Sequence, residues 1–432
     1  MNILFVSGEL IAGDLALQLQ REGNALRLFI DCPTQRDCLN GFVPKTTDWE
    51  AELDWVGKAG LIVFDDVGYG ATQDRLRREG YRVVGGSAGG DRLEIDRSFA
   101  QQVFADSGMR VEPTYNFADA GEALAYIRAQ GGVWVVKQND HQSHLNYVGV
   151  MDDGSDVRGV LASYQRLGIC NLSVQRRLRG VEVAVGRFFN GHDWVGPIEV
   201  NQEHKGLLNG ELGPKTGEMG TLMWYCESSR LFDATLGCLR DYLREVGFRG
   251  VIDINCFVDG DTIYPIEATA RFGCPATYLQ SALHRTSWTE LLNAVADGRQ
   301  CDLKVRAGYA IGLTLAVPPF PYGAGDTPYV SSAGLPMQVR CPLTADETNH
   351  LHLEGVAFVQ GNAGDEGQRT VLTSSLGYAV FVTGTGATVE AAQNAAYSLA
   401  EKIVIPKVMY RTDIGDRFLA GDRERLQAFG WI

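Results

Sequence analysis

The first 95 residues alternate between short apolar runs and helical stretches, and this alternation constrains the fold more than any other feature. The apolar runs MNILFVS, ALRLFID and GLIVFDD each end in polar or turn-forming residues, and DLALQLQREG lies between the first two. This pattern predicts a doubly wound parallel sheet that binds ligands at the carboxyl ends of its strands. The first turn, SGELIAGD, lacks the G-x-G-x-x-G spacing, which argues against a sugar or dinucleotide enzyme built on this domain.

Composition narrows the class of protein. With 432 residues, 45% of them hydrophobic, the chain is long enough for two to four domains with buried cores. Its net charge of −14 and scattered arginines argue against a nucleic-acid partner, although a small anion that arrives with its own metal could bind. Apolar runs are too short for a membrane span, so we expect no membrane association and a cytoplasmic location.

Cysteine and histidine spacing gives no support for a disulfide framework or a zinc site. The nine cysteines are odd in number and form no C-x-x-C pair. The histidine pairs His141/His144 and His350/His352 have no cysteine or carboxylate at ligand spacing nearby, so we expect no structural zinc.

The rest of the chain mixes strands and helices. We expect helices over 97–108, 119–130, 232–246 and 389–402, and strands within 133–137, 171–189, 309–317 and 378–384. A hairpin is predicted over 250–273, because its DGD sequence is a strong turn signal. The glycine-rich segment 201–221 is predicted to be a long functional loop.

Charged residues at strand ends suggest phosphate chemistry. Lys137 ends a buried strand, where a lysine facing a cleft can bind phosphate; a solvated strand terminus is the alternative. Asp253 and Glu267 alternate with apolar residues and point to the same side if the hairpin strands pair in register. Two adjacent carboxylates favour Mg²⁺ with a nucleotide phosphate, unless one of them faces solvent. Arg271 could grip a carboxylate or phosphate bidentately, or form surface salt bridges.

The segment VNQEHKGLLNGELGPKTGEMG combines glycines with three basic side chains, His204, Lys205 and Lys215. Bare backbone amides and cations in such a segment can surround an anionic ligand. A flexible surface loop is the alternative interpretation.

Three motifs follow the strand that ends in Lys137 in a fixed order: QEHK, GPKTGEMG and IEATARFG. They resemble motifs of the ATP-grasp ligases, specifically the glycinamide ribonucleotide synthetase family, which carries Q-D-H-K, G-P-N-T-G-G-M-G and I-E-F-N-x-R-F-G-D-P-E. VVGGSAGGDRLEIDRSFAQQVF and YRTDIGDRF also resemble that family, so the resemblance runs the whole length of the chain. It implies an α/β ATP-grasp fold and a monomer or homodimer. The implied domains are an N-terminal Rossmann-like domain (1–95), an ATP-grasp domain (96–300) with a lid at about 112–178, and a mixed α/β domain (301–432).

The resemblance also implies roles for individual residues, with ATP and Mg²⁺ or Mn²⁺ as cofactors. The residues implied in nucleotide binding are Arg97, Lys137, Gln175, Leu178 and Glu182. The metal ligands would be Asp253 and Glu267, with Asn255 substituting for a family asparagine that is Thr269 here. The implied catalytic residues are Arg271, Lys205 and His204. Acceptor-binding positions would be Pro214, Lys215, Thr216, Gly217, Met219 and Gly220.

The chain departs from the family pattern in three places. NDHQSHLNYVGV replaces the glycine-rich flap that covers the phosphates, so flap closure differs or ATP use is weakened. GCPA replaces G-D-P-E, and GELIAGD replaces the N-terminal G-G-R-E-H-A loop associated with the ribosyl phosphate. We therefore predict an ADP-forming carboxylate-amine ligase that acts through an acyl phosphate on small-molecule substrates, with an altered acceptor. Glycinamide ribonucleotide synthesis itself and a non-catalytic nucleotide-binding homologue are the alternatives.

Overall fold

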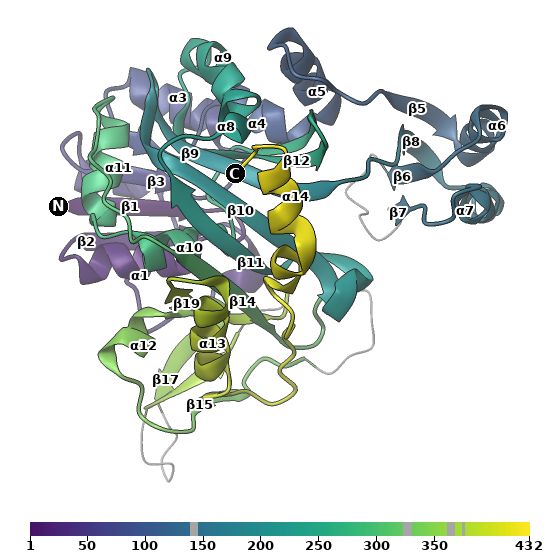
Figure 1. The fold of residues 1–432 in the computed structure, drawn as a ribbon. Helices are drawn as coiled ribbons and strands as arrows, with labels where there is room; N and C mark the ends of the chain where they lie inside the picture. Colours follow the sequence, from purple (N-terminus) through teal and green to yellow (C-terminus); the bar gives the residue numbers. More distant parts are fainter. Residues whose placement is uncertain (139–145, 323–330, 361–367, 374–375) are drawn as a thin grey trace.

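The computed structural model describes the chain except for residues 139–145, 323–330, 361–367 and 374–375 (Figure 1). The altered flap segment falls partly on 139–145, so that part of the flap, with His141 and His144, lies outside the described residues.

The N-terminal part is a four-stranded parallel sheet of order β2-β1-β3-β4, as the alternating sequence pattern predicts. Ile3 and Phe5 enter the main hydrophobic core, whereas Leu4 and Val6 pack in a separate cluster on the other face. Both faces of the sheet are therefore covered. Its elements are β1 (Asn2–Ser7), α1 (Gly13–Arg21), β2 (Ala25–Ile30), α2 (Leu53–Val56), β3 (Leu61–Phe64), α3 (Gly70–Arg78), β4 (Val83–Val84) and α4 (Ala88–Ile95).

A small unit with its own hydrophobic core projects from the right side of the molecule in Figure 1. Its sheet has the order β5-β8-β6-β7, and it follows helix α5 (Arg97–Asp106). Within it, Lys137 lies on a strand that pairs with the strand carrying Gln175. Its elements are β5 (Thr114–Asp119), α6 (Ala120–Gln130), β6 (Trp134–Gln138), β7 (Tyr147–Val148), α7 (Ser155–Arg166) and β8 (Cys170–Arg176).

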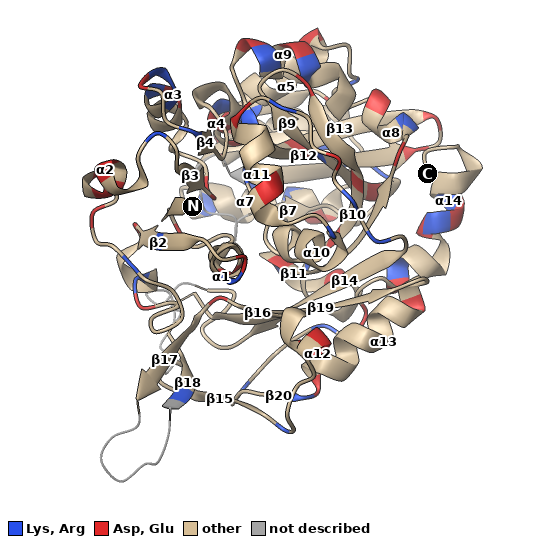
Figure 2. Cartoon of the chain, turned by 90° about the vertical axis from the view of Figure 1, so that its left-hand side faces the viewer, with Lys and Arg blue, Asp and Glu red and all other residues tan. Residues whose placement is uncertain are grey.

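The centre of the molecule is an eight-stranded antiparallel sheet of order β13-β12-β9-β10-β11-β14-β19-β16. Helix α10 lies between this sheet and the N-terminal part, beside α1 (Figure 2). The strands are β9 (Val181–Asn190), β10 (Trp194–Leu208), β11 (Leu212–Cys226), β12 (Arg249–Asp259), β13 (Thr262–Thr269), β14 (Tyr309–Ala316), β16 (Leu351–Leu353) and β19 (Tyr378–Gly386). The helices that follow these strands are α8 (Arg230–Asp233), α9 (Arg240–Glu245), α10 (Ala276–Leu283), α11 (Trp288–Ala296), α12 (Ala345–Asn349), α13 (Val389–Ala400) and α14 (Arg423–Ala428).

A second small sheet, of order β17-β18-β15-β20, completes the C-terminal part. Its strands are β15 (Pro336–Val339), β17 (Val356–Gln360), β18 (Gln368–Leu372) and β20 (Ile403–Val404). Strands from before and after residue 301 share the central sheet, and the division of the chain at 95 and 301 remains a proposal.

Two local predictions were wrong. The segment 201–221 is not a loop but a long hairpin, in which β10 and β11 pair from Ile198 opposite Cys226 to Leu208 opposite Leu212. Because the segment contains many glycines, its sequence does not show the alternation of apolar residues that is typical of a strand. Strands β9 and β14 pair with β10 and β11 on either side of the hairpin. The helix expected over 232–246 is broken into α8, a 3-10 turn and α9, because the backbone of Thr235 leaves the helical region at φ −133°.

Candidate active site

Strand β10 supplies the centre of the candidate site. Lys205 Nζ lies 2.7 Å from Glu267 Oε1 and 3.1 Å from Glu203 Oε2. Burial alone would lower the pKa of Lys205, but the two carboxylates outweigh burial and raise it. Lys205 is in turn the main cause that lowers the pKa of Glu267 to about 2. The three side chains therefore form a charged, partly buried triad beside a cavity of about 240 Å³.

The carboxylates of the β12–β13 hairpin share the face that borders this cavity, as the sequence predicts. Asn255 is directly opposite Glu267 in the strand register, and Asp253 is two residues before Asn255. Asp253, Asn255 and Glu267 all line the cavity. Asn255 Nδ2 donates a 3.0 Å hydrogen bond to Glu203 Oε2, which ties the hairpin to β10.

Two buried carboxylate oxygens in the cavity lining accept no hydrogen bond from the protein. They are Asp253 Oδ1 and Glu218 Oε1. Burial raises the pKa of both groups, and the neighbouring carboxylate Glu203 raises it further. Unpartnered acidic oxygens beside Glu267 are the donor set that Mg²⁺ prefers. Within the described residues, however, no group of three or more acidic, histidine or cysteine side chains is already arranged to hold a metal ion.

Helix α5 contributes Arg97 to the lining of the cavity, and Lys137 of the projecting unit lies close enough to Arg97 and Glu267 to interact with their charges. Arg97 lies 4.0 Å from Glu267 Oε2, and Lys137 donates a 3.3 Å hydrogen bond to Gln175 Oε1. Burial lowers the pKa of Lys137 to about 8, and the neighbouring Arg97 acts in the same direction. Opposing charges on Arg97, Lys137, Lys205 and Glu267 thus lie close together although they come from four separate elements.

Leu178 and Glu182, the other residues implied in nucleotide binding, lie where the chain passes from β8 into β9. Leu178 is half-buried between β8 and β9. Glu182 follows on β9, and burial raises its pKa, while Lys205 and Arg417 oppose that effect. Its backbone carbonyl accepts a hydrogen bond from Gln202.

Arg271 lies between two cavities. Its Nε donates to Glu94 Oε1 at 3.1 Å and its Nη1 donates to the carbonyl of Phe272 at 2.9 Å. Burial opposes its charge, but Glu94 and Asp66 raise the pKa of Arg271 above its usual value. Arg271 also lines a second cavity, of about 220 Å³, whose lining includes Glu9, Leu10, Glu354, Tyr378 and Phe381.

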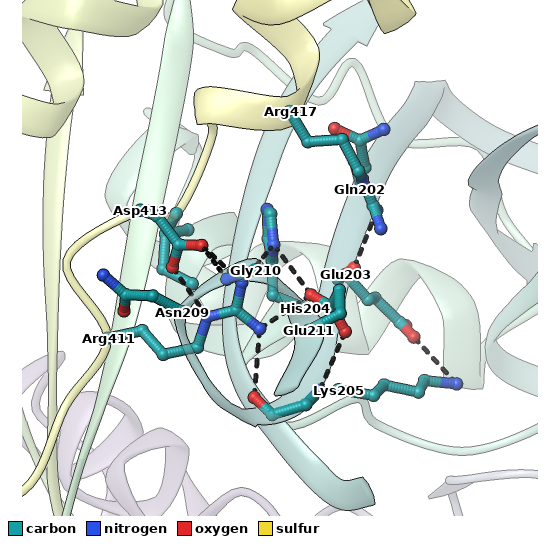
Figure 3. Close-up of polar contacts among 12 residues, drawn as sticks. Gln202, Glu203, His204, Lys205, Asn209, Gly210, Glu211, Arg411, Asp413 and Arg417 are labelled. Carbon is teal, nitrogen blue, oxygen red and sulfur yellow. Dashed lines mark hydrogen bonds and ion pairs between the residues drawn. The ribbon is translucent and has the colours of Figure 1, made fainter. Parts of the chain in front are cut away.

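The predicted catalytic role of His204 is not supported by its position. Successive residues of a strand face opposite sides, and Figure 3 shows His204 beside Glu211 whereas Lys205 extends toward Glu203. Lys205 lines the first cavity, and His204 is absent from its lining. His204 Nε2 accepts from the amide of Gly415 at 3.2 Å, which leaves Nδ1–H to donate to Glu211 Oε1 at 3.3 Å. Burial lowers the pKa of His204, which favours the neutral ring that these two hydrogen bonds require.

That face of β10 carries a network built around Arg411, which is 2% exposed. Its guanidinium contacts Glu211 Oε1, Asp413 Oδ1 and the Gly206 carbonyl at 2.7, 2.7 and 3.0 Å (Figure 3). This network attaches the C-terminal segment YRTDIGDRF to the β10–β11 hairpin.

Of the six predicted acceptor-binding positions, Gly217 is the one that appears in the described linings of these two cavities, and it lines both. Lys215 instead pairs with Glu211 at 3.0 Å, and Thr216 Oγ1 donates to the Lys205 carbonyl at 2.9 Å. The other three are a half-buried Pro214, a core residue Met219, and Gly220 inside the sheet opposite His204.

Sequence reasoning missed three acidic residues that line the first cavity, Glu94, Glu203 and Glu218. Glu203 and Glu218 lie in the recognised QEHK and GPKTGEMG motifs. If segment 201–221 is interpreted as two strands rather than a loop, Glu203 alternates with His204 and Glu218 alternates with Met219. That alternation would have placed both glutamates on one face of the sheet.

Comparison with known proteins agrees with this arrangement. Residues 95–277 match the model of the phosphoribosylglycinamide synthetase ATP-grasp (A) domain. A phosphoribosylamine-glycine ligase of Thermotoga maritima has a TM-score of 0.67 at 19% identity, covering 96% of this chain and 100% of that one. A biotin carboxylase of Campylobacter jejuni has a TM-score of 0.61 at 12% identity, covering 94% and 92%. The fold and the matched domain define an ATP-grasp enzyme.

Sequence relatives narrow the class. A phosphoribosylamine-glycine ligase of Ralstonia nicotianae is 27% identical over 360 residues, which cover 80% of this chain and 80% of that one. The phosphoribosylamine-glycine ligase of Streptomyces coelicolor is 28% identical over 374 residues, which cover 84% of this chain and 83% of that one. The chain is an ATP-grasp ligase that resembles the glycinamide ribonucleotide synthetases, as its motifs indicate. In the described part of the chain, no helix has the length and apolarity needed to cross a membrane.

Proposed function

We propose that the protein is an ADP-forming carboxylate-amine ligase that acts through an acyl phosphate. The observation that supports this proposal is that Arg271 lines two cavities, one lined by further cations and by unpartnered carboxylates, and a second one that could take the other substrate. A carboxylate is a poor electrophile, whereas its mixed anhydride with phosphate has a good leaving group.

The first step transfers the γ-phosphoryl group of ATP to the carboxylate substrate. A carboxylate oxygen forms a bond to phosphorus as the bond to the ADP oxygen breaks, and ADP leaves with that electron pair. Lys137 and Arg97 are suited to bind the phosphates, and Arg271 to orient the carboxylate. Glu267 and Asp253 would hold Mg²⁺, which when bound neutralises charge on the phosphate oxygens.

Lys205 already pairs with one of the carboxylates that we assign to Mg²⁺. Its ammonium contacts Glu267, so it neutralises the carboxylate that Mg²⁺ would otherwise neutralise. We propose that Lys205 stays paired with Glu203 when Glu267 turns to the metal. In the second step, the amine attacks the acyl carbon, the bond to the phosphate oxygen breaks, and the nitrogen proton leaves with the phosphate.

Similarity to phosphoribosylamine-glycine ligases favours a specific pair of substrates, glycine and phosphoribosylamine. We include this pair as the second candidate for the reaction. The retained Lys137, Asp253, Glu267 and Arg271 favour catalysis over a non-catalytic nucleotide-binding role.

ADP release from Mg-ATP over a panel of amino acids and other small carboxylates tests the proposal, with hydroxylamine as a generic acceptor. Formation of a hydroxamate with one carboxylate is the expected result, and it would identify half of the substrate pair. ATP binding without ADP or hydroxamate from any carboxylate would contradict acyl-phosphate chemistry.

A further inference from the structure

The second cavity is the place from which an acceptor would reach an acyl phosphate held at Arg271. It shares Gly217, Arg271 and Cys274 with the first cavity. Its volume of about 220 Å³ suits a small molecule. The chemistry of its lining therefore bears directly on which amine the enzyme accepts.

Helix α1 begins at this cavity, but its first amides are already bound by the protein's own carboxylates. A helix N-terminus binds phosphate through such amides when they are free. Here the amide of Ala12 donates to Asp65 Oδ2 at 2.9 Å, and the amide of Gly13 donates to Glu354. Two internal carboxylates thus occupy the place where an external anion would bind.

Backbone amides of the loop before helix α1 also donate to side chains of the protein. The amide of Leu10 donates to Ser7 Oγ at 2.7 Å, and the amide of Glu9 donates to Asp66. The loop amides at 9 and 10 and the helix amides at 12 and 13 therefore have partners within the protein. A phosphate arriving here would have to displace these partners before it could bind.

The side chains on the lining also disfavour an anion. Among the described residues, Arg271 is the one lysine or arginine that lines this cavity, and its Nε is bound to Glu94. Glu9 and Glu354 add two carboxyl groups. Burial raises the pKa of Glu354, and its neighbours Asp65 and Asp14 raise it further, so a cation that entered would favour its ionised form.

The remaining lining is largely apolar. Leu10 and Ile11 come from the N-terminal loop, and Tyr378 and Phe381 come from strand β19. Tyr378 and Phe381 stack with their ring centroids 5.9 Å apart. The cavity therefore combines acidic groups with an aliphatic and aromatic wall, which complements an ammonium group on an apolar body.

We propose that the acceptor is a small, unphosphorylated primary amine with an apolar body, whose ammonium group is held by Glu9 and Glu354. This inference rests on the proposed ligase function and specifies its second substrate. The ammonium loses one proton to solvent before reaction. Its nitrogen then forms the C–N bond, the acyl C–O bond breaks with its electron pair on phosphate, and a second nitrogen proton leaves with the phosphate.

The test uses the full chain, Mg-ATP and the carboxylate found with hydroxylamine, with glycine tested in parallel. Acceptors are 2-phenylethylamine, 3-methylbutylamine and freshly generated phosphoribosylamine, and the amide product is detected by mass spectrometry. Amide from an apolar amine, with none from phosphoribosylamine, is expected. Amide from phosphoribosylamine, or hydroxamate without amide from either apolar amine, would overturn the inference and leave the ligase proposal intact. Absence of hydroxamate would instead overturn the ligase proposal and, with it, this inference.

Variants of the two carboxyl groups give an independent readout. We expect Glu9→Gln and Glu354→Gln each to raise the KM for the reactive amine about tenfold, because a charge-assisted contact is lost, with a much smaller change in the KM for Mg-ATP. Glu9 is exposed, so its variant should fold even if the buried Glu354→Gln does not. Glu424→Gln, at an exposed site on α14, is the matched control. An unchanged KM for the amine in folded Glu9→Gln would contradict the assigned contact.

Discussion

Two neighbouring residues of strand β10, His204 and Lys205, belong to two charged networks that differ in how fully their polar groups are paired. On one face, His204 joins a network in which the Arg411 guanidinium is bound by Glu211, Asp413 and a backbone carbonyl. On the other face, Lys205 joins a network that leaves buried oxygens of Asp253 and Glu218 without a hydrogen-bond partner. Both networks are rich in charge, and among the described residues it is the second network that lines the cavity of about 240 Å³.

The contrast indicates how to tell a structural charge cluster from a functional one. A buried ion network that is fully paired within the protein has nothing left with which to bind a ligand, so its contribution is to hold elements together. Buried carboxylate oxygens without partners carry a desolvation cost that a bound cation would remove. We therefore expect changes in the Lys205 network to affect catalysis, and changes in the Arg411 network to affect stability.

The largest expected effect comes from Glu267→Gln. We expect kcat for ADP release to fall at least about 10³-fold, because the variant loses a metal-binding carboxylate and a partner of Lys205. The free energy of unfolding in urea should change far less, by about 1–2 kcal/mol. The control is Glu50→Gln, whose carboxylate pairs with Arg75 on the exposed surface. Wild-type rates in Glu267→Gln would rule out the metal assignment.

Arg411→Met tests the other face of β10. It should lower the free energy of unfolding by about 2–3 kcal/mol, since the half-buried carboxylates of Glu211 and Asp413 lose their buried guanidinium partner. The kcat of the folded fraction should remain close to wild type. Arg75→Met, which breaks exposed pairs, should cost less than about 1 kcal/mol. A large loss of kcat at unchanged stability would show that the Arg411 network takes part in catalysis, and it would contradict the distinction between the two networks.

The third prediction concerns the pH dependence of ATP binding through Lys137. Its pKa is lowered to about 8, so the side chain is charged below that pH and loses its charge as the pH rises through 8. The KM for Mg-ATP should therefore rise about tenfold between about pH 7 and pH 9. In Lys137→Arg, the guanidinium stays charged, and the rise should disappear. A similar rise in that variant would assign the titration to another group.

Sequence predicted the parts of this molecule that depend on neighbours in the chain. The apolar runs that form β1, β2 and β3, and the DGD turn that pairs Asn255 with Glu267, need only local periodicity and turn chemistry. The motifs QEHK, GPKTGEMG and IEATARFG, in this order after the strand that ends in Lys137, were enough to indicate the ATP-grasp class.

What sequence did not predict depends on which strand lies beside which. The pairing of β10 with β9 and β11 determines whether His204 or Lys205 faces the cavity. Because segment 206–220 is rich in glycine, its sequence does not indicate that pairing. The binding of the α1 amides by Asp65 and Glu354 joins residues far apart in the chain. Such contacts have no signature in local sequence.

The smallest expected effect is that of Cys274→Ala. Cys274 lines both cavities, where a thiolate could act as a nucleophile, but burial raises the pKa of its thiol well above the usual value and nearby Glu354 adds to this shift. A protonated thiol is a poor nucleophile, and acyl-phosphate transfer needs no covalent enzyme intermediate. The kcat should therefore stay within about threefold of wild type, as it should in Cys238→Ala at an exposed position. Complete loss of activity in folded Cys274→Ala alone would show that the junction of the two cavities supplies a nucleophile as well as the Arg271 charge.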